Sequence, residues 1–251
     1  MSIDLSGRTA VITGASRGIG LGIAERFAAA GSTLHLIADD EKVLAAAAKL
    51  GASAAVADIA DAEKVSEALS TLSRIDILIN NAGLERLTPI AEGAEDVEAM
   101  FRRIIEVNVI GTQLVTRRAI KLMGQGAAII NTASVWGRVA EPLFGAYVAS
   151  KHALIGLTKT WAHELGPKGI RVNAVCPGWV KTESSMRSLA HMAKRRQVGE
   201  EELLGEIVGK QAFAGLMEPA DVAALYLFLA SDLAENITGQ SIGVDRGEVP
   251  W

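Results

Sequence analysis

A glycine-rich turn near the N-terminus places the strongest constraint on how this chain can fold. The apolar run 10–12 is followed directly by Gly14, Gly18 and Gly20, and then by an alanine-rich helical pattern. This succession predicts a strand, a tight turn and a helix. Residues 33–38 form a second apolar run. The beginning of the chain therefore predicts a βαβ unit.

The same alternation continues along the chain. Further strands are expected at 52–57, 75–80, 127–132, 170–175 and 241–244, and helices at 41–50, 62–72, 96–123, 144–165 and 219–230. Near-continuous apolar strands that alternate with helices indicate a parallel sheet covered on both faces, with right-handed connections. With 251 residues, 49% of them hydrophobic, the chain can bury a core of this kind. We therefore expect one α/β domain over residues 1–251.

Residues 182–216 interrupt this alternation. Two short helices are expected there, at 186–192 and 200–210, separated by the basic stretch 194–196. A helical segment outside the sheet pattern is a candidate lid over a substrate pocket. A solvated helical excursion is the alternative.

The glycine turn is suited to hold a dinucleotide. Its glycines allow a pyrophosphate to approach the backbone, and the first N–H groups of the following helix can bind an anion. The spacing is one residue longer than G-x-G-x-x-G, and a turn that only makes room for helix packing is the alternative. Asp39 and Asp40 follow the second strand, where a carboxylate can bind ribose hydroxyls and repel a 2′-phosphate, whereas Arg17 could pair with that phosphate. We favour NAD, with NADP as the alternative.

Tyr147 and Lys151 are four residues apart in the helical pattern 144–165, so their side chains share one helix face. A phenol beside a fixed cation is a plausible acid/base, because the positive charge favours phenolate and lowers the tyrosine pKa. The same spacing also occurs by chance on solvated helix faces. The role of this pair therefore depends on the rest of the chain.

Several motifs occur together in a characteristic order and separation. They are Thr13-Gly14-x-x-x-Gly18-Ile19-Gly20, Asn80-Asn81-Ala82-Gly83, Asn108, Ser134, Tyr147-x-x-x-Lys151 and Pro177-Gly178. Together they resemble the short-chain dehydrogenase/reductase family over essentially the whole chain. The resemblance implies a Rossmann-type, doubly wound sheet of seven parallel strands with helices on both faces. It also implies a nicotinamide cofactor and, commonly, a homotetramer.

The resemblance further implies roles for individual residues. Tyr147 would move a proton to or from the substrate oxygen, Lys151 would lower the pKa of Tyr147 and bind the nicotinamide ribose, Ser134 would hold the same substrate oxygen, and Asn108 would support a water chain. A helix cap is the alternative for Ser134 and Asp58, and a backbone-bonded polar residue for Asn108. The implied cofactor-binding residues are Gly14, Ser16, Arg17, Gly18, Ile19, Gly20, Asp39, Asp58, Ile59, Asn80, Ala82, Gly83, Tyr147, Lys151, Pro177, Gly178, Val180 and Thr182.

The expected substrate is a secondary alcohol or ketone. By the geometry that the resemblance implies, the residues facing it are Ser134, Trp136, Glu141, Phe144, Tyr147 and Trp179. Aromatic walls with one carboxylate favour a polyol or sugar-like molecule somewhat over a steroid or fatty acyl chain. Alternatives are an NADP-dependent ketone or 3-oxoacyl reductase and a non-catalytic dinucleotide-binding sensor.

Composition disfavours several other classes of protein. A net charge of −4 argues against a nucleic-acid-binding surface. Cys176 is the only cysteine and the four histidines show no paired ligand spacing, so no metal site is predicted. The N-terminus lacks the apolar core of a signal peptide, and no apolar run reaches the roughly 18–20 residues of a membrane span. We expect a cytoplasmic protein without a membrane or nucleic-acid partner, whose terminal Trp251 reaches a neighbouring subunit or pocket.

Overall fold

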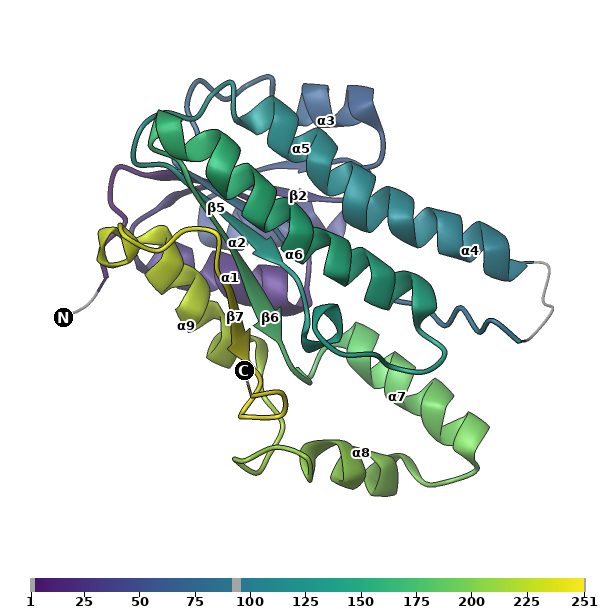
Figure 1. Ribbon diagram of the computed structural model, residues 1–251. Helices are drawn as coiled ribbons and strands as arrows, with labels where there is room; N and C mark the ends of the chain where they lie inside the picture. The colour runs from purple at the N-terminus through teal and green to yellow at the C-terminus, as the bar shows by residue number, and fades with distance from the viewer. Residues whose placement is uncertain (1–2, 92–95, 251) are drawn as a thin grey trace.

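Seven parallel strands form one sheet at the centre of the computed structural model, in the order β3-β2-β1-β4-β5-β6-β7 (Figure 1). They are β1 (Thr9–Thr13), β2 (Thr33–Ala38), β3 (Ser53–Val56), β4 (Ile77–Asn80), β5 (Ala128–Thr132), β6 (Arg171–Pro177) and β7 (Ser241–Val244). The strand order runs in opposite directions from β1 and from β4, so the sheet is doubly wound and the predicted fold class is confirmed. The structure describes residues 3–91 and 96–250. Trp251 and its expected contact lie outside the described residues.

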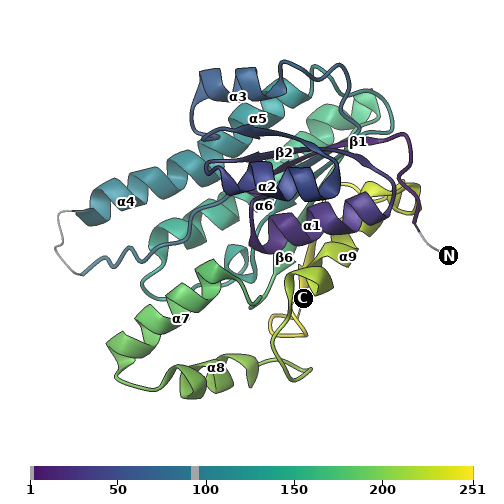
Figure 2. The ribbon, with the colours of Figure 1, turned by 180° about the vertical axis from the view of Figure 1, so that it is seen from behind.

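Helices cover both faces of this sheet (Figures 1 and 2). The α-helices are α1 (Gly18–Ala29), α2 (Lys42–Leu50), α3 (Ala62–Leu69), α4 (Asp96–Ile105), α5 (Thr112–Ala119), α6 (Gly145–Leu165), α7 (Glu183–Arg196), α8 (Glu200–Val208) and α9 (Pro219–Ala230). Helices α1, α2 and α9 pack on one face, and α3, α5 and α6 on the other. Short 3-10 helices are η2 (Val135–Gly137), η3 (Gly166–Lys168) and η4 (Asp232–Ala234).

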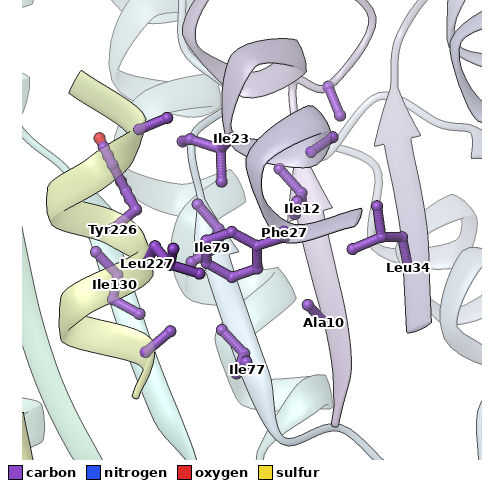
Figure 3. Close-up of a cluster of buried hydrophobic side chains, with 14 of the residues drawn as sticks. Ala10, Ile12, Ile23, Phe27, Leu34, Ile77, Ile79, Ile130, Tyr226 and Leu227 are labelled. Atoms are coloured by element: carbon purple, nitrogen blue, oxygen red, sulfur yellow. The ribbon is translucent and has the colours of Figure 1, made fainter. Parts of the chain in front are cut away.

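Alternate strand residues supply two hydrophobic cores. Ile12 belongs to the core in which Phe27 of α1 and Tyr226 of α9 are buried, which Figure 3 shows. Val11 and Leu78 point to the opposite face and pack with α3, α5 and α6. This alternation follows from the two-residue period of a strand. Because both faces are filled, a ligand cavity can form only at an edge, where loops follow the carboxyl ends of the strands.

The expected helix at 96–123 has an irregular centre and ends early. Between α4 and α5 lies the π-helical turn η1 (Glu106–Gly111). Here Gly111 packs so closely on Ile59 that a Cβ at this position would be 2.8 Å from Ile59 Cγ1. The predicted end at 123 was wrong, because the Leu122 carbonyl accepts a hydrogen bond from the Ile75 N–H (3.0 Å) and the chain turns toward the sheet.

The segment 182–216 differs from expectation in its helix boundaries. The Thr182 side chain accepts from the Ser185 N–H (3.1 Å), so α7 begins at Glu183 rather than near 186. It continues through the basic stretch 194–196, where we expected a break, because lysine and arginine favour the last turn of a helix. Arg196 then pairs with Glu206 of α8 (2.7 Å). Both helices lie outside the sheet layers (Figure 1).

In the described part of the chain, no helix is long and apolar enough to cross a membrane. Within residues 3–91 and 96–250, no three side chains of His, Cys, Asp or Glu are grouped so that they could hold a metal ion.

Candidate active site

Two adjoining cavities open along the carboxyl edge of the sheet. The larger cavity, of about 430 Å³, is lined by Asp39 and Asp58 beyond β2 and β3, by Thr132 at the end of β5, and by Tyr147 and Lys151 of α6. The smaller cavity has a volume of about 100 Å³ and also contains Tyr147 in its wall. A ligand in each cavity would therefore contact the same tyrosine.

Hydrogen bonds connect the glycine turn to the segment that follows β4. The Thr13 hydroxyl oxygen accepts from the backbone N–H groups of Asn81 and Ala82 (3.0 Å each), and Asn81 Nδ2 donates to the Gly14 carbonyl (3.2 Å). Gly14 has φ +66°, and a Cβ there would be 2.7 Å from Ala82 Cα. A Cβ at Gly20 would collide with the Gly14 carbonyl oxygen. These two positions need glycine for the turn to pack this closely.

The charged groups at the β2 and β3 ends of the larger cavity are arranged in pairs. Arg17 pairs with Asp40, and its Nε lies 3.7 Å from a carboxylate oxygen of Glu183. Burial raises the pKa of Asp40, but hydrogen bonds from Arg17 and Ser16 outweigh it and hold that pKa below its usual value. Asp39 lies in the cavity wall.

Asp58 also lies in the wall of the larger cavity, where it pairs with Arg103 of α4. Its carboxylate accepts from the Ala60 N–H (3.0 Å). The N-terminal cap of α3 that we considered for Asp58 is supplied by Asp61, whose side chain accepts from Glu63 and Lys64.

Lys151 is held over the ring of Tyr147. The Lys151 side chain is buried, its Nζ donates to the Thr132 carbonyl (2.6 Å), and it lies 5.3 Å from the centroid of the Tyr147 ring. Burial lowers the pKa of Lys151 to about 8, although the charge of Glu85 opposes this shift. Burial and the charge of Glu85 raise the pKa of Tyr147, while a hydrogen bond with Ser134 lowers it. We expected Lys151 to lower the Tyr147 pKa; here desolvation dominates instead, and the pKa is raised.

Ser134 lines a cavity, whereas Asn108 is buried and connects two segments of the chain. Ser134 lies in the wall of the smaller cavity and also caps η2, since its Oγ accepts from the Trp136 N–H (3.1 Å). Asn108 is buried in η1 and lines neither cavity. Its amide oxygen accepts from the Leu84 N–H (2.7 Å) and its Nδ2 donates to the Ser150 hydroxyl (2.9 Å). Asn108 thus ties the segment after β4 to α6, the helix that carries Tyr147.

The walls contain most of the predicted cofactor residues. The larger cavity is lined by Gly14, Ser16, Arg17, Gly18, Ile19, Asp39, Asp58, Ile59, Ala82, Gly83, Tyr147, Lys151 and Thr182, and the smaller by Pro177, Gly178 and Val180. Gly20 and Asn80 line neither. Gly20 lies under the turn, and the Asn80 Nδ2 donates to Thr116 and Asn131 (2.9 Å each) beneath the cavities.

Some of the predicted substrate residues line the smaller cavity and others do not. Ser134, Trp136, Tyr147 and Trp179 line the smaller cavity, whereas Glu141 and Phe144 do not. Phe144 is fully buried and packs on Trp136 at 4.9 Å between ring centroids, so it supports the wall from behind.

The predicted site residues did not include two carboxyl groups in these walls. Glu85 lines both cavities and Glu248 lines the smaller one. Burial raises the pKa of each group, although a hydrogen bond with Ser188 opposes the shift at Glu85. The position of Glu85 just after Asn80-Asn81-Ala82-Gly83 was a usable signal, whereas no local pattern distinguishes Glu248.

Known proteins resemble this chain throughout its length. The family model described as enoyl-(acyl carrier protein) reductase matches residues 14–248. A D-beta-hydroxybutyrate dehydrogenase of Rhizobium meliloti is 38% identical, over 96% of this chain and 98% of that protein. Solved structures match as well. A crystal structure of a short-chain dehydrogenase/reductase of Brucella melitensis, described as a glucose/ribitol dehydrogenase, has a TM-score of 0.88 and 30% identity, and the match covers 100% of both chains. A short-chain dehydrogenase of Burkholderia cenocepacia, in complex with NADP, has a TM-score of 0.83 and 32% identity. The match covers 97% of this chain and 98% of that chain.

The chain belongs to the short-chain dehydrogenase/reductase family, whose members are oxidoreductases of alcohols and ketones that bind a nicotinamide dinucleotide. Its own residues fit such a ligand. Gly14 and Gly18 leave the turn open to the larger cavity, and the N-terminus of α1 has no side-chain cap. Uncapped N–H groups at a helix start favour a pyrophosphate.

Proposed function

We propose that the protein interconverts a small secondary alcohol and its ketone with NAD(H). The observation that carries this proposal is the place of Tyr147, in the wall shared by the two cavities, with Ser134 in the wall of the smaller one. When bound in the larger cavity, the nicotinamide supplies the hydride acceptor or donor. A substrate in the smaller cavity would lie against Ser134 and Tyr147.

In this proposal Tyr147 is the proton donor and acceptor. During ketone reduction its hydroxyl protonates the carbonyl oxygen, and during alcohol oxidation the phenolate takes the same proton back. Burial raises the pKa of Tyr147, which keeps it protonated near neutral pH and suits reduction. Ser134 holds the substrate oxygen. Lys151 packs on the ring of Tyr147 and binds the ribose. Asn108 fixes the position of α6.

We favour NAD because of the charges beside the glycine turn. Asp39 lies in the wall of the larger cavity, where a carboxylate binds ribose hydroxyls and disfavours a 2′-phosphate. The nearby Arg17 is already engaged by Asp40 and Glu183. The second candidate is NADP, because the Arg17 side chain is 51% exposed and lines the same cavity.

Titration of NADH and NADPH against the wild type, Asp39→Ala and Arg17→Ala tests this choice by fluorescence. We expect the wild type to bind NADH at least about tenfold more tightly, and Asp39→Ala to reduce that preference by a similar factor, as expected for one charged hydrogen bond. If the wild type prefers NADPH and Arg17→Ala selectively weakens that binding, the NAD assignment is wrong.

The walls of the smaller cavity support a compact, polar substrate. A volume of about 100 Å³ is well below the roughly 300–1,000 Å³ of pockets for drug-sized ligands. We therefore propose a small polyol or sugar-like alcohol rather than a steroid or acyl chain. Helices α7 and α8 are the proposed lid, because Trp179 packs in one cluster with Leu189 and Leu203 of these helices.

We also propose the assembly and location that the family resemblance implies, a homotetramer in the cytoplasm. Phe101 of α4 and Ile110 of η1 are 41% and 49% exposed. Large apolar side chains on an outer helix are consistent with a subunit contact.

A further inference from the structure

We infer that Glu248 and Trp179 form a subsite for a second hydroxyl group of the substrate, and that this subsite selects an uncharged vicinal diol or hydroxyketone. The inference rests on the proposed function and adds a specificity-determining residue to it. It concerns Glu248, in the segment that follows β7.

The position of Glu248 is fixed by the packing of that segment on the turn after β6. The Asp245 carboxylate accepts from the N–H groups of Gly247 (3.1 Å) and Val249 (2.9 Å), which folds the chain around residue 248. The Gly178 N–H donates to the Val244 carbonyl (3.0 Å). A Cβ at Gly178 would be 2.9 Å from Asp245 Cα and 3.1 Å from Glu248 Oε2. Glycine at 178 therefore leaves the space in which the Glu248 carboxyl group lies.

Two residues that line the smaller cavity each have a buried polar atom without a hydrogen-bond partner. Glu248 Oε2 and Trp179 Nε1 are both buried, and neither is paired with any described residue. Trp179 is only 8% exposed, so its indole N–H is withdrawn from bulk water. Buried polar atoms are normally paired, so orphaned ones in a cavity wall indicate a ligand that supplies the partners.

The chemistry of the two atoms defines that ligand group. Oε2 is an acceptor and the indole N–H is a donor, and a hydroxyl group can satisfy both at once. Ser134 and Tyr147 are already assigned to the oxygen on the reacting carbon. The second hydroxyl would therefore belong to another carbon of the same small molecule.

The lining of the smaller cavity disfavours an anionic substrate. Its described lining contains the carboxyl groups of Glu85 and Glu248 and no lysine or arginine. A substrate carboxylate would therefore find no cation there to pair with. This chain is thus expected to differ in substrate from a dehydrogenase of a hydroxy acid.

Oxidation of three small alcohols tests the inference: 2,3-butanediol, 2-butanol and 3-hydroxybutyrate, each with whichever coenzyme the wild type binds. The wild type should give the highest kcat/KM with 2,3-butanediol and the lowest with 3-hydroxybutyrate. Glu248→Ala should lower kcat/KM for the diol about tenfold to a hundredfold, the effect of losing one hydrogen bond to a charged group, and change that for 2-butanol less than about threefold. Glu248→Gln, which keeps one acceptor oxygen, should recover part of the loss.

The matched control is Glu164→Ala, which removes an exposed carboxyl group on α6 and should leave all three rates unchanged. NADH binding by Glu248→Ala should equal that of the wild type. If Glu248→Ala lowers the rates for diol and monoalcohol equally, or if 3-hydroxybutyrate is the best substrate, the subsite is refuted while the proposed function stands. If the wild type oxidises none of the three with either coenzyme, the proposed function fails and this inference with it.

Discussion

The larger and the smaller cavity share Tyr147 but are built from different kinds of chain segment. The larger one is lined mostly by residues that follow β1, β2, β3 and β4, with further residues from α4, α6 and α7. The smaller one brings together η2, the turn after β6, α6 and Glu248 near the end of the chain. Most of the larger cavity is thus placed by the sheet, whereas the smaller cavity depends mainly on how four later segments pack together.

This difference has a consequence for chemistry. The larger cavity carries many charged side chains of both signs, of which Arg17 and Glu183, and Arg103 and Asp58, form ion pairs. The smaller cavity combines two tryptophans with orphaned polar atoms and carboxyl groups. The first arrangement suits a ligand common to a whole family, and the second suits a ligand particular to this chain. Variants that affect one cavity and spare the other test the comparison.

Tyr147→Phe should give the largest effect and separate the two cavities. We expect kcat to fall by about 10²–10⁴-fold, because the residue that moves the proton is lost. Binding of NADH should change less than about threefold, since the ring that lines the larger cavity remains. Steady-state kinetics and fluorescence titration measure the two quantities.

The matched control for this variant is the other tyrosine of the chain. Tyr226 is buried in α9 and donates to the Thr132 hydroxyl (2.8 Å) but lines neither cavity. Tyr226→Phe should cost about 1 kcal/mol of stability, the usual value of one hydrogen bond, and leave kcat within about threefold. Turnover that survives Tyr147→Phe would remove this residue from the proposed mechanism.

Lys151→Met should reveal the energetic cost of a buried cation beside the larger cavity. Burial lowers the pKa of Lys151 from 10.5 to about 8, so the stability of the wild type decreases as pH falls from 10.5 to 8 and stays reduced below 8. The free energy of unfolding of the variant, relative to the wild type, should therefore decrease by about 2 kcal/mol between pH 7 and pH 9.5. Urea denaturation at the two pH values measures it.

Lys159→Met provides the control, because Lys159 is exposed on the same helix. Its stability relative to the wild type should be the same at both pH values. If the free energy of unfolding of Lys151→Met, relative to the wild type, is also the same at both pH values, burial does not destabilise the Lys151 ammonium.

Glu85→Gln should give the smallest effect and tests the carboxyl group that lies in both walls. The charge of Glu85 raises the pKa of Tyr147, so its removal should move the alkaline loss of ketone reduction to lower pH. The pH dependence of kcat measures this shift, with Glu218→Gln, an exposed partner of Lys181, as control. An unchanged or higher midpoint would contradict the electrostatic link between Glu85 and Tyr147.

The sequence alone was sufficient for the sheet, the glycine turn and the Tyr147–Lys151 pair. Each depends on short-range physics: strands and helices leave apolar patterns of different period, and glycine is needed where the backbone packs as closely as at Gly14. The helix ends were less accurate. The early end of α5 results from a hydrogen bond between Leu122 and Ile75, which lie far apart in the sequence.

Tertiary structure alone decided the electrostatics and the smaller cavity. A spacing of four residues places Lys151 near Tyr147, but burial and the Thr132 carbonyl determine how its ammonium is held and which way both pKa values move. Glu248 enters the same site because the segment after β7 packs on Gly178. Contacts between residues so distant in the chain leave no periodic signal, and desolvation depends on everything packed around a group, so neither could be read from the sequence.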